Sequence, residues 1–269
     1  MFDREMGTRA AASVEAVRQE RPLVHNITNY VVMNVTANAL LAAGALPVMA
    51  HAAEEVAEMV SMAGALVLNI GTLSPSWVEG MFLAGQRANE LGVPVILDPV
   101  GSGATAFRTG TARRILMEIK VAVVRGNASE VISLINSGST TKGVEAVHGV
   151  DEAVDAAVRL SRDLLSTVVI TGEEDLVTDG NRIYRVSNGH RLMGRITGAG
   201  CTATSLIGAF HAVDPDPVEA SAGALAFFGL AGEKAALESR GPGTFQAALL
   251  DALYELTPSE VQEGARITT

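Results

Sequence analysis

Residues 65–98 read ALVLNIGTLSPSWVEGMFLAGQRANELGVPVILD and contain a predicted strand, a predicted helix and a second predicted strand. The two strands, Ala65–Ile70 and Val93–Asp98, are largely apolar without alternation, which is typical of strands buried on both faces. Between them, Ser76–Leu91 has apolar residues at helical spacing. This order predicts a parallel strand pair joined by a crossover helix.

The same alternation continues on both sides of this stretch. Further predicted strands are Leu23–Ile27, Ala45–Met49, Val121–Arg125 and Thr167–Thr171. Further predicted helices are Val31–Ala43, Glu54–Ala63, Thr109–Ile119, Val150–Leu165, Cys201–Val213, Pro217–Glu238 and Thr244–Leu256. Residues 175–186 differ, because Asp179-Gly180 between two β-prone pieces indicates a hairpin. The pattern predicts an α/β fold with a mostly parallel sheet and helices on both faces.

The domain organisation follows from length and composition. The chain has 269 residues, of which 48% are apolar, and this suits a compact enzyme with a large core. It contains no Pro/Ser-rich linker, no internal repeat and no low-complexity segment. We predict a single domain over residues 1–269, with residues 1–20 as an N-terminal helix or arm and residues 257–269 as a C-terminal tail.

The charge balance argues against a polyanionic partner. Twenty basic residues face thirty acidic ones, for a net charge of −10, and no Lys/Arg-rich run compensates. Binding to a phosphate backbone needs a basic surface, so we expect no nucleic-acid partner. The single cysteine, Cys201, excludes an internal disulfide and a thiolate-based metal cluster, and it fits a reducing compartment.

No export signal or membrane span is expected. Residues 1–21 are rich in charged side chains and lack an apolar core of the signal-peptide type. The longest apolar stretches, such as Ala37–Ala50, are interrupted and fall short of the roughly 20 residues that a membrane-spanning helix needs. We therefore expect a soluble cytoplasmic protein.

Candidate functional side chains gather where the predicted strands end. In chain order these strand ends carry Asn26, Met49, Asn69, Asp98, Arg125 and Thr171. In an open parallel sheet, ligands bind beyond the carboxyl ends of the strands. The sequence therefore predicts a binding site at this edge of the sheet.

A glycine turn precedes one of the predicted helices. The segment Ile196-Thr197-Gly198-Ala199-Gly200-Cys201-Thr202 has two glycines separated by one residue. Glycine allows the backbone to turn its N–H groups outward, and the helix that follows adds the positive end of its dipole, so the segment can bind an anion. A tight turn that needs a positive φ explains the same residues equally well.

A second glycine cluster raises the alternative of a nicotinamide-dependent dehydrogenase. Gly101, Gly103 and Ala106 follow a strand in the loose dinucleotide-binding pattern. That pattern requires an acidic residue about 20 positions later, at the end of a strand, to hold the ribose. The next strand ends in Arg125, which has the wrong charge, and we reject this alternative.

Two carboxylates form a candidate magnesium site. Asp98 ends a buried strand and Glu130 follows the next strand, so both belong to neighbouring strand ends. Magnesium prefers oxygen ligands and keeps most of its waters, so one or two carboxylates near phosphates suffice. Each residue also has a simpler explanation, Asp98 as a turn residue before Pro99 and Glu130 as a first-turn acid favoured by the helix dipole.

In this order, the motifs resemble the ribokinase-like superfamily and, within it, the hydroxyethylthiazole kinase family. The resemblance covers roughly Arg21 to Leu256. The matching segments are Pro22–Tyr30, Pro47–Ala50, Leu68–Leu73, Asp98–Gly101, Arg125–Glu130, Val169–Gly172, Thr197–Cys201 and Gly241–Phe245. The His25-Asn26-Ile27-Thr28-Asn29 segment and the cysteine after the glycine turn are the specific elements.

The resemblance implies a fold, an activity and site residues. It implies a three-layer α/β/α sandwich without a lid domain, and ATP- and Mg²⁺-dependent phosphorylation of 4-methyl-5-(2-hydroxyethyl)thiazole for thiamine synthesis. It also implies a homotrimer with active sites shared between subunits. The matching positions are Asn26, Met49 and Gly198 for the thiazole, Arg125 and Thr171 for ATP, and Asp98 and Glu130 for magnesium.

Cys201 departs from the superfamily pattern, in which an aspartate acts as the general base. We expect the N–H groups of Gly198, Ala199, Gly200 and Cys201 to hold the transferring phosphoryl group. A thiol has a pKa near 8.5, and a helix N-terminus lowers it, so we expect Cys201 to be a partly ionised base. The alternative is a small buried apolar residue.

Two other functions remain open. One is a kinase of the same superfamily that acts on a hydroxymethylpyrimidine or on pyridoxal. The other is a sensor that binds a nucleotide or the thiazole without turnover. A panel of alcohols separates the first from the thiazole kinase, and binding without turnover in the presence of magnesium identifies the second.

Overall fold

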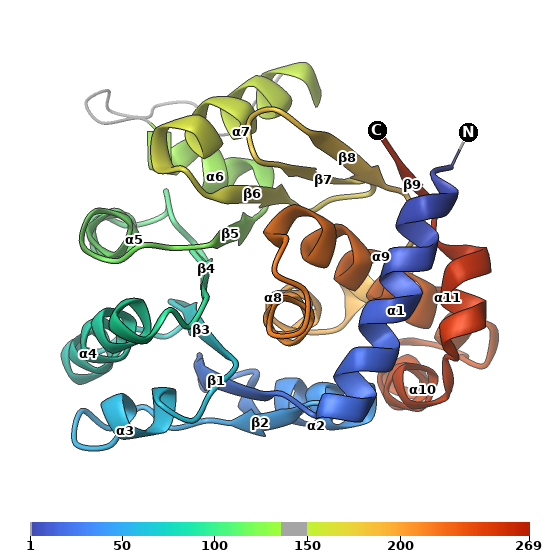
Figure 1. Ribbon diagram of the computed structural model, residues 1–269, viewed down its shortest axis with the longest axis horizontal. Helices are drawn as coiled ribbons and strands as arrows, with labels where there is room; N and C mark the ends of the chain where they lie inside the picture. Colours follow the sequence, from blue (N-terminus) through green and yellow to red (C-terminus); the bar gives the residue numbers. More distant parts are fainter. Residues whose placement is uncertain (1, 136–149) are drawn as a thin grey trace.

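The computed structural model describes residues 2–135 and 150–269. Within these residues a nine-stranded sheet has the order β2-β1-β3-β4-β5-β6-β7-β8-β9 (Figure 1). Its strands are β1 (Leu23–Ile27), β2 (Leu46–Val48), β3 (Ala65–Asn69), β4 (Val95–Asp98), β5 (Val123–Gly126), β6 (Thr167–Ile170), β7 (Asp175–Thr178), β8 (Ile183–Val186) and β9 (Ile267–Thr268). From β2 to β6 all neighbouring strands are parallel, which confirms the predicted mostly parallel sheet.

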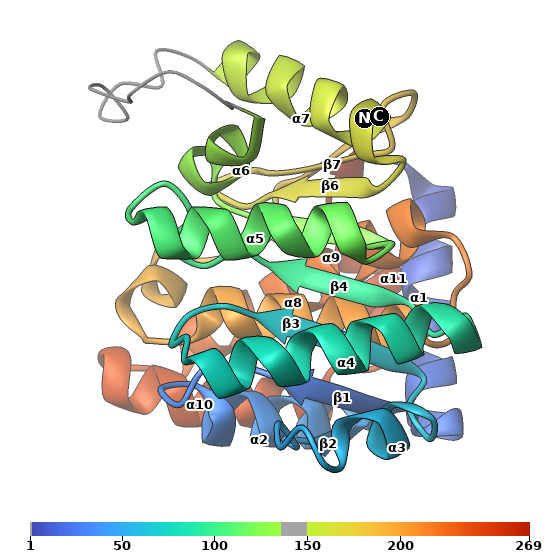
Figure 2. The ribbon, with the colours of Figure 1, turned by 90° about the vertical axis from the view of Figure 1, so that its left-hand side faces the viewer.

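Helices cover both faces of the sheet. One layer contains α3 (Val56–Val60), α4 (Pro75–Leu91), α5 (Ala106–Glu118), α6 (Ala128–Ile135) and α7 (Val150–Leu164), which Figure 2 shows from outside. On the other face, α2 (Met33–Ala43), α8 (Ala199–His211) and α9 (Pro217–Leu237) pack on the strands. Outside these helices lie α1 (Arg4–Glu20), α10 (Pro242–Glu255) and α11 (Pro258–Gly264). Within the described ranges, no helix is both long and apolar enough to cross a membrane.

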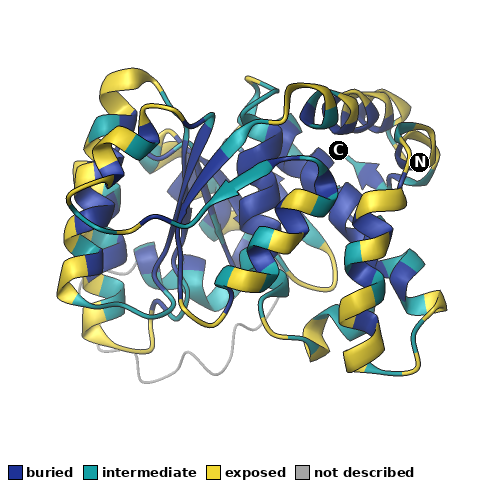
Figure 3. Cartoon of the chain, turned by 90° about the horizontal axis from the view of Figure 1, so that it is seen from below, coloured by how far each residue is buried: buried dark blue, intermediate teal, exposed yellow. Residues whose placement is uncertain are grey.

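The core is divided by the sheet into two apolar clusters, one under each helix layer. In β3, Leu66 and Leu68 belong to one cluster and Val67 belongs to the other. Successive side chains of a strand point to opposite faces, so an apolar run without alternation supplies both clusters. Figure 3 shows the buried strands between two layers whose outer faces are exposed.

The predicted hairpin is confirmed. β7 and β8 pair antiparallel and extend the parallel part of the sheet through β6. In the connecting loop Gly180 has a φ of 88°, and Asp179 Oδ1 accepts the N–H groups of Asn181 and Arg182. The glycine and the aspartate therefore each have a defined role in the turn.

The C-terminal residues, expected as a tail, form α11 and β9. Thr257 and Glu260 form a capping box at the start of α11, with Thr257 Oγ1 accepting the Glu260 N–H. β9 then pairs antiparallel with β8, and the Asp3 N–H donates to the Ile267 carbonyl at 2.8 Å. The N-terminal residues expected as a helix or arm form α1, whose N-cap is Asp3.

Candidate active site

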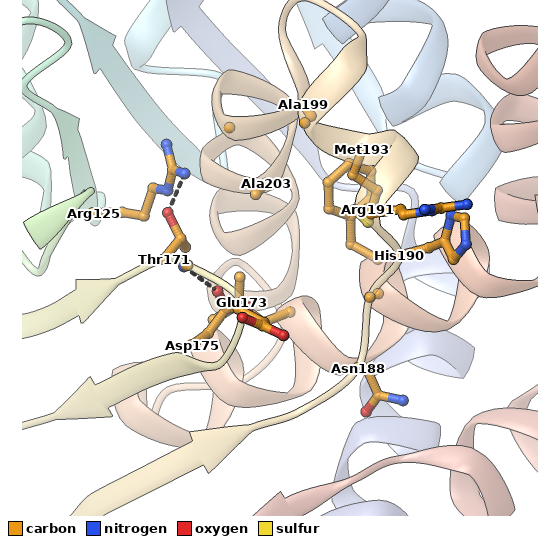
Figure 4. Close-up of a pocket in the computed structure, with 17 residues that line it drawn as sticks. Arg125, Thr171, Glu173, Asp175, Asn188, His190, Arg191, Met193, Ala199 and Ala203 are labelled. Atoms are coloured by element: carbon orange, nitrogen blue, oxygen red, sulfur yellow. Dashed lines mark hydrogen bonds between the residues drawn. The ribbon is translucent and has the colours of Figure 1, made fainter. Parts of the chain in front are cut away.

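A cavity of about 780 Å³ opens where β5, β6 and the start of α8 meet (Figure 4). Four residues expected in the site, Arg125, Thr171, Ala199 and Gly200, line it. The remaining walls come from the β6–β7 turn, the segment between β8 and α8, and α9, with lining residues that include Asp175, Asn188, His190, Met193, Leu225 and Phe228. The cavity therefore lies at the carboxyl edge of the sheet, as the strand ends predict.

The glycine turn forms the N-terminus of α8. Gly198 is the N-cap, with φ 86° and ψ −2°, a left-handed conformation that favours glycine. Its backbone also packs closely on α2, because a Cβ there would lie 3.0 Å from Cγ1 of both Val32 and Val35. No side chain from the described residues caps this helix, so its first-turn N–H groups are available to an anion.

The positively charged guanidinium of Arg125 lies beside the N-terminus of α8. Its NH2 group donates to Thr171 Oγ1, and NH1 lies 3.7 Å from Asp98 Oδ2. A Cβ built on Gly200 would lie 2.7 Å from NH1, so the guanidinium rests on the first turn of α8. The arginine and the helix amides therefore face the same space.

Asp98 is fully buried at the end of β4. Its Oδ2 accepts from Asn69 Nδ2 at 2.9 Å and from Thr204 Oγ1 at 2.8 Å. Its Oδ1 is buried and has no hydrogen-bond partner among the described residues. Burial raises the pKa of Asp98 to about 6, against the opposing effect of Arg125. An unpartnered carboxylate oxygen is a suitable ligand for a hard cation.

Glu130 holds together the two loops that follow β4 and β5. Its Oε1 accepts the Gly101 N–H at 2.8 Å and its Oε2 accepts the Asn127 N–H at 2.9 Å. Its negative charge contributes to the raised pKa of Asp98. No group of three His, Cys, Asp or Glu side chains in residues 2–135 and 150–269 is arranged to hold a metal. A Mg²⁺ ion that keeps most of its waters needs only one or two carboxylates near phosphates.

Cys201 lies in the first turn of α8, and its sulfur is 3.6 Å from Asn29 Nδ2. Burial raises the pKa of the Cys201 thiol to about 11, and the negative charge of Asp98 adds to this effect. The expectation that the helix N-terminus makes this thiol partly ionised near neutral pH is therefore wrong. Burial, which disfavours a thiolate, outweighs the lowering effects of Asn69, Arg125 and Asn29 on this pKa.

Asn26 and Met49 do not line the large cavity, and neither do Asp98, Glu130, Gly198 and Cys201. The Asn26 side chain is fully buried, donates to the Val24 carbonyl at 2.9 Å and accepts from Ser205 Oγ at 2.7 Å. It therefore connects β1 to α8, and this geometry does not favour the expected direct contact with a substrate. Met49 directly follows β2 and is half-buried.

Several residues near the site were not assigned a role from the sequence. Asn29, Asn69 and Thr204 join the groups around Cys201 and Asp98 by hydrogen bonds. Asp175 lines the cavity and accepts the Gly172 N–H at 3.0 Å, and burial raises its pKa to about 6. Asn69 at a strand end and Asn29 in the His25–Asn29 segment were the available signals.

Comparison with known proteins identifies the family. The model of the "Hydroxyethylthiazole kinase family" matches residues 14–259. A hydroxyethylthiazole kinase of Desulfotalea psychrophila is 58% identical over 96% of this chain and 94% of its own length. The solved structure of hydroxyethylthiazole kinase protein from Pyrococcus horikoshii OT3 has a TM-score of 0.89 at 47% identity, over 96% of this chain and 98% of that chain.

A more distant solved structure confirms the expected ribokinase-like fold. A ribokinase-like superfamily protein of Enterococcus faecalis V583 has a TM-score of 0.64 at 15% identity, over 88% of this chain and 87% of that chain. At that identity the likeness concerns the fold alone. The family model and the close relatives carry the assignment further: this chain belongs to the hydroxyethylthiazole kinase family.

Proposed function

We propose that this protein transfers the terminal phosphoryl group of ATP to the primary hydroxyl of 4-methyl-5-(2-hydroxyethyl)thiazole, in thiamine biosynthesis and salvage. The observation that carries the proposal is that Arg125, Thr171 and the uncapped start of α8 share one cavity. Behind the cavity wall, the Oδ2 atom of buried Asp98 lies 3.7 Å from Arg125 NH1. The name of the family supports the identity of the acceptor.

The chain's own groups act mainly by positioning and by charge neutralisation, which dominate phosphoryl transfer. Arg125 and Thr171 bind the nucleotide phosphates from the ends of β5 and β6. The N–H groups of Gly198, Ala199, Gly200 and Cys201 bind the oxygens of the transferring group, where negative charge spreads in the transition state. Because the helix is already formed, these donors need no reorganisation during the reaction.

Asp98 and Glu130 would hold a magnesium ion. Asp98 contributes its unpartnered Oδ1, while Glu130 uses the lone pairs that its two backbone hydrogen bonds leave free. When bound, Mg²⁺ neutralises phosphate charge and orients the phosphate oxygens. Arg125 adds a positive charge to the same region.

We propose that Cys201 is the general base and that Met49 and Gly198 contact the thiazole. Asn26 stabilises α8 through its hydrogen bond with Ser205. With a pKa of about 11, only a small fraction of the thiol is ionised at neutral pH. Proton removal contributes less to phosphoryl transfer than positioning does, so a small ionised fraction is compatible with turnover. A carboxylate at this position would be ionised far more completely.

We also propose that the protein is cytoplasmic and forms a homotrimer with active sites between subunits. Two large apolar residues next to Asn29 are exposed, Tyr30 by 65% and Val31 by 62%. These two side chains would be available for contact with another subunit. Light scattering of the full chain in solution tests the trimer.

The direct test is a kinase assay with a panel of alcohols. We expect ADP and a phosphorylated product with Mg-ATP and the thiazole alcohol, and neither product when magnesium is chelated. A hydroxymethylpyrimidine and pyridoxal are the matched competing acceptors. Preferential phosphorylation of either competitor would replace the proposed substrate, and binding of the thiazole and ATP without turnover would indicate a sensor.

A further inference from the structure

A chain of buried hydrogen bonds connects Asp98 to Cys201. Asn69 and Asp98 are register partners on β3 and β4, and Asn69 Nδ2 donates to Asp98 Oδ2 at 2.9 Å. Asn29, which follows β1, donates from its Nδ2 to Asn69 Oδ1 at 2.9 Å. The same Nδ2 lies 3.6 Å from the Cys201 sulfur. Four separate segments of the chain meet in this way.

Backbone groups fix the direction of each hydrogen bond. The Gly71 N–H lies 3.0 Å from Asn69 Oδ1, and the Val31 N–H lies 3.1 Å from Asn29 Oδ1. A backbone N–H can only donate, so each amide must present its oxygen there. The Asn69 NH₂ group then faces Asp98, which accepts, and the Asn29 NH₂ group faces Cys201. Neither amide can be flipped without losing its backbone partner.

The Asn29 side chain also has little room to move. Asn29 is 4% exposed and Asn69 is 2% exposed. The backbone of Gly71 packs against Asn29 so closely that a Cβ there would lie 2.6 Å from Nδ2 and 2.9 Å from the Asn29 Cβ. The φ of Gly71 is not in the left-handed region, so close packing is the reason that this position requires glycine.

We propose that Asn29 is a positioning residue for phosphoryl transfer, which holds the Cys201 sulfur in place by an N–H···S hydrogen bond whose direction Asn69 sets. The inference rests on the proposed function, in which Cys201 contacts the reacting hydroxyl. The position of the sulfur matters because a small displacement of a reacting group lowers the reaction rate by a large factor. Because the Asn29 side chain is buried and its amide faces Cys201, its effect passes through the sulfur.

A double-mutant cycle tests this dependence. We expect Asn29→Ala to lower kcat about tenfold or more, with KM for ATP changed less than about twofold. In a Cys201→Ala background the same substitution should lower kcat less than about twofold, because the group through which it acts is gone. Equal losses in the two backgrounds would show that Asn29 acts independently of Cys201 and would overturn the inference.

A second variant displaces Asn29 without removing a polar atom. Gly71→Ala should reproduce the loss of kcat, again only when Cys201 is present. Gly110→Ala is the matched control, since a Cβ on Gly110 meets nothing within 4 Å on α5. Asn38→Ala is the control for a nearby exposed asparagine, and both controls should retain wild-type kcat.

The outcomes separate the two proposals. If the wild-type chain does not phosphorylate the thiazole alcohol, the proposed function fails and this inference fails with it. If the wild type turns over but the cycle is additive, only the role of Asn29 is overturned. Asn29→Asp provides the conservative comparison, because it keeps the shape but cannot donate, and it should be no better than Asn29→Ala.

Discussion

The Arg125 guanidinium lies against the backbone of Gly200, so that a Cβ on Gly200 would be 2.7 Å from NH1 and 2.8 Å from NH2. Gly200 is inside α8 and its φ is not in the left-handed region. This glycine is therefore required by the arginine and not by the turn. A positive φ therefore accounts for Gly198, and the close approach of Arg125 accounts for Gly200.

Gly200→Ala should weaken nucleotide binding while the protein still folds. The added methyl group displaces the end of a flexible side chain, and we expect KM for ATP to rise about tenfold, which corresponds to about 1.4 kcal/mol of lost binding. Steady-state kinetics with varied ATP and a thermal melt measure the two effects. Gly110→Ala is the matched control. An unchanged KM for ATP would place the phosphates away from Arg125.

Cys201→Ala should lose most of kcat, whereas Cys201→Asp should equal or exceed the wild type. Because the pKa of the thiol is about 11, at lower pH its ionised fraction increases about tenfold for each unit by which the pH is raised. The kcat of the wild type should therefore increase between pH 7 and 9, and that of Cys201→Asp should be flat. Normal turnover by the alanine variant would remove the base assignment.

Glu130→Gln should destabilise the loops after β4 and β5. An amide can accept only one of the two backbone N–H groups that the carboxylate binds, and its NH₂ group would face the other donor. We expect a loss of about 1–3 kcal/mol in the free energy of unfolding and a higher Mg²⁺ requirement. Denaturant unfolding measures the loss of stability, and a magnesium titration of the activity measures the Mg²⁺ requirement. A variant with wild-type stability would contradict the bridging role.

Asp175 should make stability depend on pH. Its folded-state pKa is raised to about 6, above its ordinary value, so between pH 4 and 6 the folded state binds more protons than the unfolded state. The free energy of unfolding should therefore fall as pH rises through this window, by about 1–2 kcal/mol for a half-buried group. Asp175→Asn should lack this contribution. Parallel pH dependences in the two proteins would contradict the prediction.

The sequence was most informative where strands are buried on both faces. β3 was predicted to within one residue because an apolar run without alternation is typical of a strand buried on both faces. β1 was predicted with its observed bounds although it contains His25 and Asn26. The short elements α6 and α11, of eight and seven residues, were missed because they span too few turns to show a periodic pattern. Their capping residues, Asn127 and Thr257, were the available signals.

Within the candidate site, strand ends predicted that Arg125 and Thr171 lie together, but not the hydrogen bonds around Asp98 and Cys201. The partnership of Asn69 with Asp98 depends on the register of β3 and β4, and that of Asn29 with Cys201 depends on how α8 packs. The pKa of Cys201 was predicted in the wrong direction because burial in the fold outweighs the local helix effect. Such three-dimensional relationships have no signature in the linear pattern.

Both edge strands of the sheet, β2 and β9, are short. β2 has three residues, including Pro47, which has no N–H to offer, and β9 has only two residues. Unpaired edge strands invite pairing with other chains, and short strands or prolines at the edge prevent it. This architecture therefore guards against fibril-like growth. We therefore expect self-association of the protein to use side chains that fit together and not a shared sheet.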